Sequence, residues 1–143
     1  MSFSDLAQKN YRWYADAESI DPDGNSAIAG ENQPMLNLPN LRKRHLRINV
    51  GSPVMNFPAG QVFKLQYQQG TTTGTWTDVG TGAFTGGILS CCSGGTAINT
   101  LQLSSSTIKE TFETSGTSVE IPNAINAGGV AEWDWVIQNH STA

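Results

Sequence analysis

Residues 129–139 read GVAEWDWVIQN and form the clearest strand pattern in the chain. Apolar and polar residues alternate along this stretch, as they do on a β-strand with one face toward the core. The apolar face would carry Ala131, Trp133, Trp135 and Ile137, and the polar face would carry Glu132, Asp134 and Gln138. Residues 41–50, LRKRHLRINV, repeat the alternation and place His45, Arg47 and Asn49 opposite Leu46, Ile48 and Val50.

Further strand patterns extend over the rest of the chain and are separated by clusters of Gly, Pro, Asn and Ser. They lie at residues 9–16, 61–69, 75–79, 97–103, 108–114 and 117–122. No window of a dozen residues keeps helical spacing. We therefore predict an all-β chain that folds as a single antiparallel β-sandwich, of jelly-roll or immunoglobulin-like connectivity, with about seven to nine strands.

Length and composition agree with one such domain. The chain has 143 residues, 15 of them glycine, and only 14% are charged. We expect residues 1–8 to form an N-terminal arm and residues 9–143 to form the sandwich, with residues 17–40 as a long wrapping loop. No apolar run approaches the ~20 residues that cross a bilayer, and the first residues lack a secretory pattern. We expect neither a membrane segment nor a secretion signal.

Half of the eight basic residues lie within six positions, although the net charge is −4. They are Arg42, Lys43, Arg44 and Arg47. We interpret these residues as a solvated or partner-facing strand and as candidates for binding an acidic protein surface, although a strand would divide them between two faces. Nucleic acid is not expected, because no aromatic residue is interleaved with them.

No group of residues predicts catalysis. Glu132 and Asp134 share a strand face at a separation of about 7 Å, which would suit a glycosidase, but we interpret them as the half-exposed side of the strand. The two histidines, His45 and His140, do not form a recognisable triad with them. We predict a non-enzymatic protein without a catalytic, metal or cofactor site. The adjacent Cys91 and Cys92 are expected to be free thiols in a reducing cytoplasm.

Four tryptophans and three tyrosines raise a second possibility. Trp13, Trp133 and Trp135 fall on apolar strand faces and are predicted to lie in the core. Trp76 and Tyr14 are the candidates for an exposed aromatic side chain that stacks on a sugar ring.

Several of these strands together resemble a β-sandwich module of tailed-phage virion proteins, which also occurs in large bacterial surface proteins. The matching pieces are YRW (residues 11–13), LRINV (46–50), FKLQY (63–67), GTW (74–76), TFE (111–113) and EWDWVIQ (132–138).

The resemblance implies a structural or adhesive role. In its phage setting the chain would be a capsid decoration (cement) protein or a minor head or fibre component, made in the host cytoplasm and incorporated into the virion. Its expected partner is the major capsid protein or another virion protein, and we expect a homo-oligomer, with a trimer favoured. The alternatives are a carbohydrate-binding adhesive module at the cell surface and an extracellular filament subunit that assembles by strand exchange.

Overall fold

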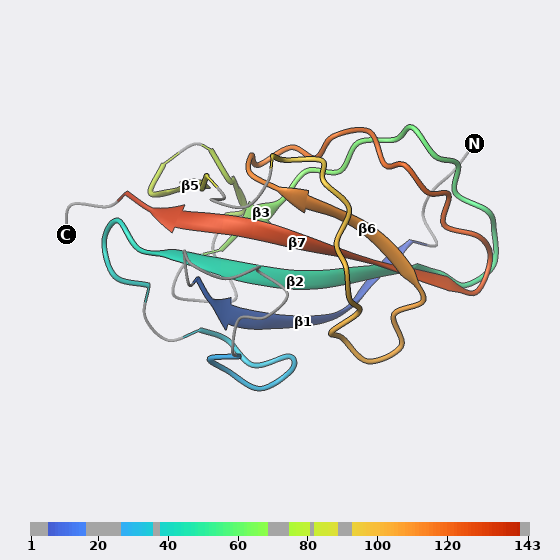
Figure 1. The fold of residues 1–143 in the computed structure, drawn as a ribbon, viewed down its shortest axis with the longest axis horizontal. Coiled ribbons are helices and arrows are strands. Elements are labelled where there is room, and N and C mark those ends of the chain that lie inside the picture. The colour runs from blue at the N-terminus through green and yellow to red at the C-terminus, as the bar shows by residue number, and fades with distance from the viewer. Residues whose placement is uncertain are drawn as a thin grey trace.

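The computed structural model describes residues 6–16, 27–35, 38–68, 75–80, 82–88 and 93–140. These residues contain no helix, so the predicted all-β class is confirmed, and none of them offers a helix that could span a membrane. The strands that they form are β1 (Ala7–Ala15), β2 (Lys43–Ser52), β3 (Gln66–Tyr67), β4 (Thr77–Asp78), β5 (Phe84–Gly86), β6 (Ile108–Glu113) and β7 (Gly129–Asn139). Figure 1 shows the long strands β1, β2 and β7 lying side by side.

A five-stranded sheet is built around β7. β2 pairs antiparallel with β7 over its full length, with Leu46 opposite Trp135 and Ile48 opposite Trp133, and β1 adds to the free edge of β2. β5 and β6 pair with the other edge of β7, β5 antiparallel and β6 parallel. The parallel pair departs from the purely antiparallel arrangement that the sequence predicts.

A second layer covers the apolar face of this sheet. It contains the small β3–β4 sheet and two extended segments, residues 57–65 and 116–125, which exchange backbone hydrogen bonds. The Phe63 ring lies 4.9 Å from the Trp133 ring between centroids, a tilted contact that joins the two layers. Gly116 approaches the Val79 carbonyl oxygen so closely that a Cβ would collide with it. The two layers are consistent with the predicted β-sandwich.

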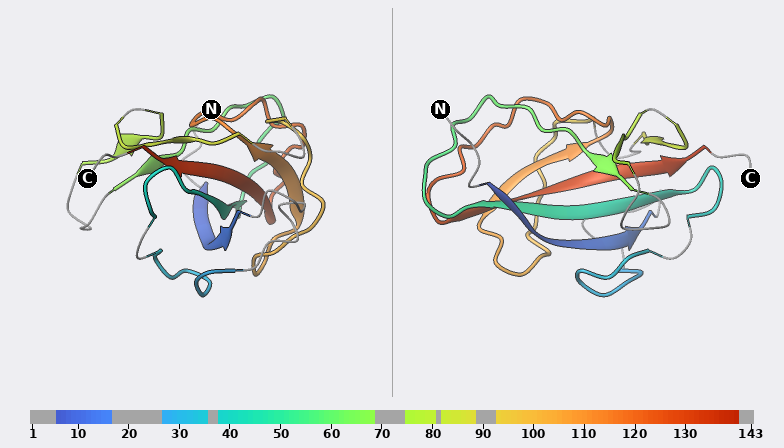
Figure 2. Two further views of the ribbon diagram at one scale, coloured as in Figure 1. Left: turned by 60° about the vertical axis from the view of Figure 1, so that its left-hand side comes forward. Right: turned by 180° about the vertical axis from the view of Figure 1, so that it is seen from behind.

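The polar face of the sheet is also covered. Residues 100–106 cross it and hydrogen-bond to its side chains, and residues 95–98 pair with β6. The views in Figure 2 place this connection and the β3 layer on opposite sides of the sheet. Because both faces are covered, the expectation of a half-exposed polar face is wrong.

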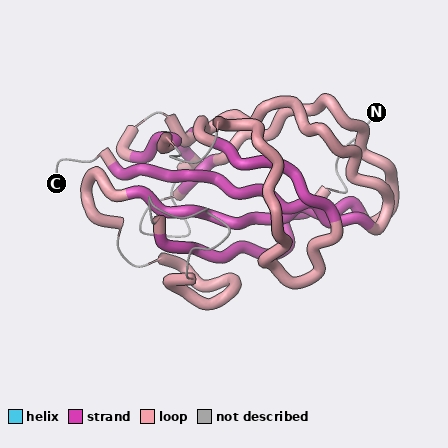
Figure 3. The backbone as a smooth tube through the Cα atoms, viewed as in Figure 1, coloured by secondary structure: helices cyan, strands magenta, loops and turns pink. Residues whose placement is uncertain are grey.

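Other local predictions also need correction. β1 begins at Ala7, so residues 7 and 8 of the predicted arm belong to a strand. Residues 97–103 and 117–122 form isolated bridges or irregular extended structure instead of strands, as Figure 3 shows by their loop colour. β5 was not predicted, because it lies in a glycine-rich stretch. Of the predicted wrapping loop, residues 27–35 and 38–40 are described and contain no strand.

Candidate functional site

A cluster of charged side chains lies inside the molecule, on the polar face of the five-stranded sheet. We call it the buried network, and it consists of Asp16, His45, Arg47, Glu132 and Asp134. All except Asp16 are at most 1% exposed. β2 and β7 supply four of these residues at alternate positions, so their register brings the opposite charges together.

Arg47 is the centre of the buried network. Its Nε donates to Asp134 Oδ2 and its Nη1 to Glu132 Oε2, both at 2.8 Å. Nη1 also donates to the Thr100 carbonyl oxygen, and the guanidinium carbon lies 5.8 Å from the centroid of the Phe112 ring. Ionic, hydrogen-bonding and cation–π contacts therefore stabilise this one buried charge.

The Glu132 carboxylate is also fully hydrogen-bonded. In addition to Arg47 it accepts hydrogen bonds from the backbone N–H groups of Gln102 and Leu103 and from the Ser106 hydroxyl. The connection that covers the polar face is thus fixed by this carboxylate. A buried charge with this many partners is typical of a structural group.

His45 links two carboxylates through its two ring nitrogens. Nδ1 lies 2.7 Å from Asp134 Oδ1, and Nε2 lies 2.9 Å from Asp16 Oδ1. Burial lowers the pKa of His45, but the hydrogen bonds and charges of Asp134 and Asp16 outweigh this effect, and the pKa is raised above its ordinary value of 6.5. The imidazolium, which donates from both nitrogens, matches this arrangement.

The buried network has no access to either of the two cavities described below, since none of its members lines them. Glu132 and Asp134, interpreted from the sequence as half-exposed, are buried, and that expectation is wrong. Their positions are explained by the charges of Arg47 and His45. The sequence contained one indication that these charges are buried together: two predicted strands carry opposite charges at the same spacing.

A second pair of buried acidic side chains lies on β6. Glu110 is 0% exposed, and neither of its carboxyl oxygens has a hydrogen-bond partner among the described residues. Burial raises its pKa to about 7, against the opposing effect of the backbone N–H of Asn123, and the neighbouring Glu113 adds to the increase. Burial also raises the pKa of Glu113, although Glu113 accepts hydrogen bonds from the Thr111 hydroxyl and the Val119 N–H. Glu110 is thus a protonated carboxyl over much of the acidic pH range.

The four predicted partner-binding basic residues are divided by the fold. Arg47 is only 1% exposed and bound within the network, so the expectation that it faces a partner is wrong. Arg42 is exposed, while Lys43 and Arg44 are half-buried. Lys43 Nζ donates to the Ile88 carbonyl oxygen at 3.0 Å and lies 3.9 Å from Asp16.

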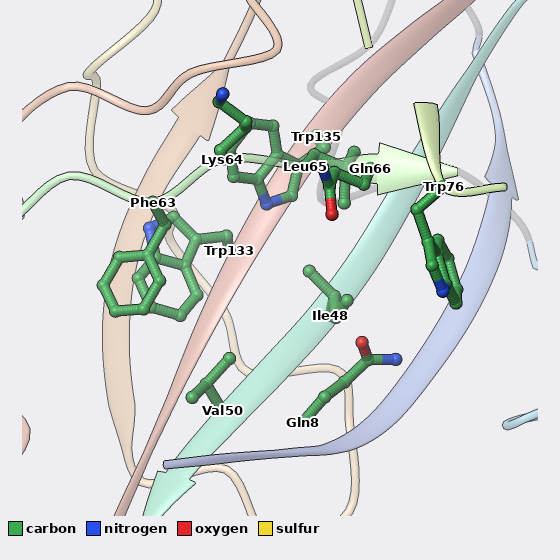
Figure 4. Close-up of a pocket in the computed structure, with 10 residues that line it drawn as sticks. All are labelled: Gln8, Ile48, Val50, Phe63, Lys64, Leu65, Gln66, Trp76, Trp133 and Trp135. Carbon is green, nitrogen blue, oxygen red and sulfur yellow. The ribbon is translucent and has the colours of Figure 1, made fainter. Parts of the chain in front are cut away.

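An uncharged groove lies between the β1–β2 side of the sheet and the β3–β4 layer. We call it the aromatic groove. Its volume is about 570 Å³, and its aromatic lining residues are Tyr11, Trp13, Tyr67, Trp76 and Phe84. Amide side chains also line it, from Gln8, Gln66, Gln68 and Asn139. A smaller cavity of about 300 Å³ shares five of its residues, including Trp76 and Gln8, and continues toward Phe63 and Trp133 (Figure 4).

The two predicted glycan-stacking residues are separated by the structure. Trp76 is 59% exposed and lines both cavities, so it keeps its candidate role. Tyr14 is 7% exposed and points to the polar face, where burial raises its pKa, and its side chain is not accessible for stacking. The core positions of Trp133 and Trp135 are confirmed, while Trp13 is half-buried against the core and borders the groove.

The remaining candidates contribute no site. His140 is exposed at the end of β7. Cys91 and Cys92 lie outside the described residues. Within the described part of the chain, no group of three or more His, Cys, Asp or Glu side chains could hold a metal ion.

Comparison with known proteins identifies no relative of this chain: no family model, no curated protein and no solved structure matches it.

Proposed function

We propose that the chain is a non-enzymatic virion structural protein of the capsid decoration type, with a β-sandwich fold, that binds the outer shell of a phage head. The resemblance of its strands to virion modules gives the class. The distribution of charge supports it, because His45, Glu132 and Asp134, the residues considered from the sequence for acid–base chemistry, are buried in the network. The exposed surface of the described residues instead carries basic, apolar and aromatic side chains, which are suited to binding.

The observation that carries the proposal is an exposed surface where basic and apolar side chains meet. We call it the loop-end surface, and it consists of Leu41, Arg42, Lys43 and Ile88. Leu41 and Ile88 are 62% and 80% exposed, and the hydrogen bond from Lys43 to the Ile88 carbonyl oxygen holds the two segments together. Exposed apolar residues beside a cation are typical of protein-binding surfaces.

Leu41 is also held in an unfavourable backbone conformation. Its φ is 64°, in the left-handed region that a branched residue rarely adopts. Its N–H donates to the Asn139 carbonyl oxygen, and its own carbonyl oxygen accepts from the Gln138 side chain. Neither bond requires leucine, so the exposed isobutyl group is not explained by the folding of this turn. We infer that the Leu41 side chain contacts the capsid.

The covered sheet edges favour docking over strand exchange. The outer edge of β1 bonds to residues 28 and 32, and the outer edge of β6 bonds to residues 95–98. An edge that is already paired is a poor template for another chain. Filament formation by strand exchange is therefore the weaker alternative, and a trimer would form through side-chain surfaces.

Capsid binding tests the proposal. Shells of the phage that encodes this chain, assembled without it, are mixed with the purified protein and sedimented. We expect the wild type to cosediment, and Arg42→Glu and Leu41→Asn to bind at least about tenfold more weakly. Asparagine tolerates the left-handed region better than leucine, so Leu41→Asn removes the apolar group without harming the fold.

Lys109→Glu is the matched control, because Lys109 is an exposed cation on β6 outside the loop-end surface. It should bind like the wild type. A wild-type protein that stays monomeric and does not sediment with the shells would refute the proposal. Equal losses in the control and in Arg42→Glu would refute the role of the loop-end surface.

A further inference from the structure

The aromatic groove is a second feature of the surface that the docking proposal does not use, since neither Leu41 nor Arg42 lines it. We propose that the aromatic groove is a binding site for a neutral saccharide. The proposal deepens the glycan-binding alternative that Trp76 raises, and it does not depend on capsid binding.

The first argument is the accessibility of flat aromatic side chains. Trp76 projects from the segment before β4 and faces the same space as Ile48 and Gln8 of the neighbouring strands (Figure 4). It is 59% exposed, so a large apolar ring stays in water unless a ligand covers it. Trp13 and Tyr11 line the same groove from β1, opposite the β3–β4 layer. Sugar rings have apolar C–H faces that suit such surfaces.

The second argument is the kind of polar group at the groove. Its polar lining side chains are the amides of Gln8, Gln66, Gln68 and Asn139 and the Tyr hydroxyls. An amide carries both donors and acceptors and can therefore pair with the hydroxyl groups of a sugar in either sense. The amide of Gln66 is held in place by its hydrogen bond to Asp78 Oδ1 at 2.8 Å. A lipid chain would remove water from the exposed side chains of Gln8 and Gln66 without offering them a hydrogen bond, which is costly.

The third argument is the absence of charge. None of the described residues that line the aromatic groove is ionisable as an acid or a base at neutral pH. A sulfated, phosphorylated or uronic-acid saccharide would lose water around its charge without gaining an opposite one in the groove, and Lys64 in the smaller cavity is paired with Asp78 at 3.1 Å. The volume of about 570 Å³ lies in the usual range of small-ligand sites. The class that fits is a short stretch of neutral glycan.

Titration calorimetry with three neutral probes, maltohexaose, cellohexaose and chitohexaose, tests the site on the full chain. We expect at least one probe to bind with a Kd below about 1 mM, and the affinity to be the same at low and high salt. Trp76→Ala should weaken this binding by about tenfold or more. Gln8→Ala should also weaken it, but by a smaller factor. Both positions are exposed, so neither variant should lose the fold.

Val54→Ala is the matched control, since Val54 is an exposed apolar residue that lines neither cavity. It should bind the probe like the wild type, and all variants should keep their capsid binding. No heat from any probe at about 10 mM would overturn the proposal. Unchanged binding in Trp76→Ala would also overturn it, as would a preference for heparin or for a fatty acid over the neutral probes.

Discussion

Replacement of Glu110 by glutamine should stabilise the protein at neutral and alkaline pH and leave its stability unchanged in acid. Glu110 is fully buried, and burial raises its pKa more than the backbone N–H of Asn123 lowers it, while Glu113 raises it further. Glutamine has nearly the same shape as the protonated acid and carries no charge. The variant therefore removes only the cost of ionising this group inside the protein.

The size of the effect follows from the pKa. The folded protein holds the Glu110 proton up to a pH of about 7, while the unfolded chain releases it near 4.5. Because the folded pKa is raised, wild-type stability falls as the pH increases between these values and is level above them. The difference corresponds to about 3 kcal/mol as an upper limit.

Urea unfolding, followed by tryptophan fluorescence at a series of pH values from about 4 to 8, measures this difference. Glu110→Gln should match the wild type near pH 4 and should be more stable by up to about 3 kcal/mol at pH 8. Glu120→Gln is the control, because Glu120 is exposed, and it should differ little at any pH. A gain that is equal at pH 4 and pH 8, or a loss at pH 8, would refute the account of Glu110 as a buried, unpaired acid.

Two further predictions concern the buried network. Arg47→Met should destabilise the fold by about 3–5 kcal/mol, since it leaves two buried carboxylates without their shared cation, and urea unfolding measures this loss. A cost below about 1 kcal/mol would show that the network contributes little. His45 should titrate above 6.5 by NMR, and its contribution to stability should be complete below pH 6.5 and lost as the pH rises through its folded pKa. A His45 pKa at or below 6.5 would contradict the two-carboxylate arrangement.

The fold class and the two central strands could be predicted from the sequence because alternation is a local property. Residues 129–139 and 43–52 form β7 and β2 almost as predicted, and Trp133 and Trp135 face the core. Period-two alternation needs no knowledge of the neighbour, since a strand with one apolar face fits any apolar layer.

The burial of the polar face could not be predicted in the same way. It depends on a connection, residues 100–106, whose backbone N–H and C=O groups bond to Glu132 and Arg47. Nothing in the local sequence of this connection specifies that partner, and its apolar residues were interpreted as a strand. The same limit explains why the burial of Tyr14 could not be predicted, since its exposure depends on which segment covers β1.

The loop-end surface could be predicted from the sequence only in part. The basic cluster of residues 42–47 was visible in the sequence, but its division between surface and interior follows from the register of β2 with β7. The exposure of Leu41 had no signal at all, because its left-handed φ arises from bonds to residues about a hundred positions away. Contacts of this range are set by topology and cannot be read from a local pattern.

The buried network gives the sheet a register that its apolar face alone would not specify. If β2 moved by two residues along β7, Leu46 and Ile48 would still face the core, since the alternation has period two. A shift that placed Arg47 opposite Val136 would move it four residues along β7 from Glu132, and the bonds to both carboxylates could not form together. Loss of these bonds would leave charge buried without a partner, which costs several kcal/mol. The apolar residues therefore determine which face of β2 and β7 lies inward, and the charged residues determine how the two strands are aligned.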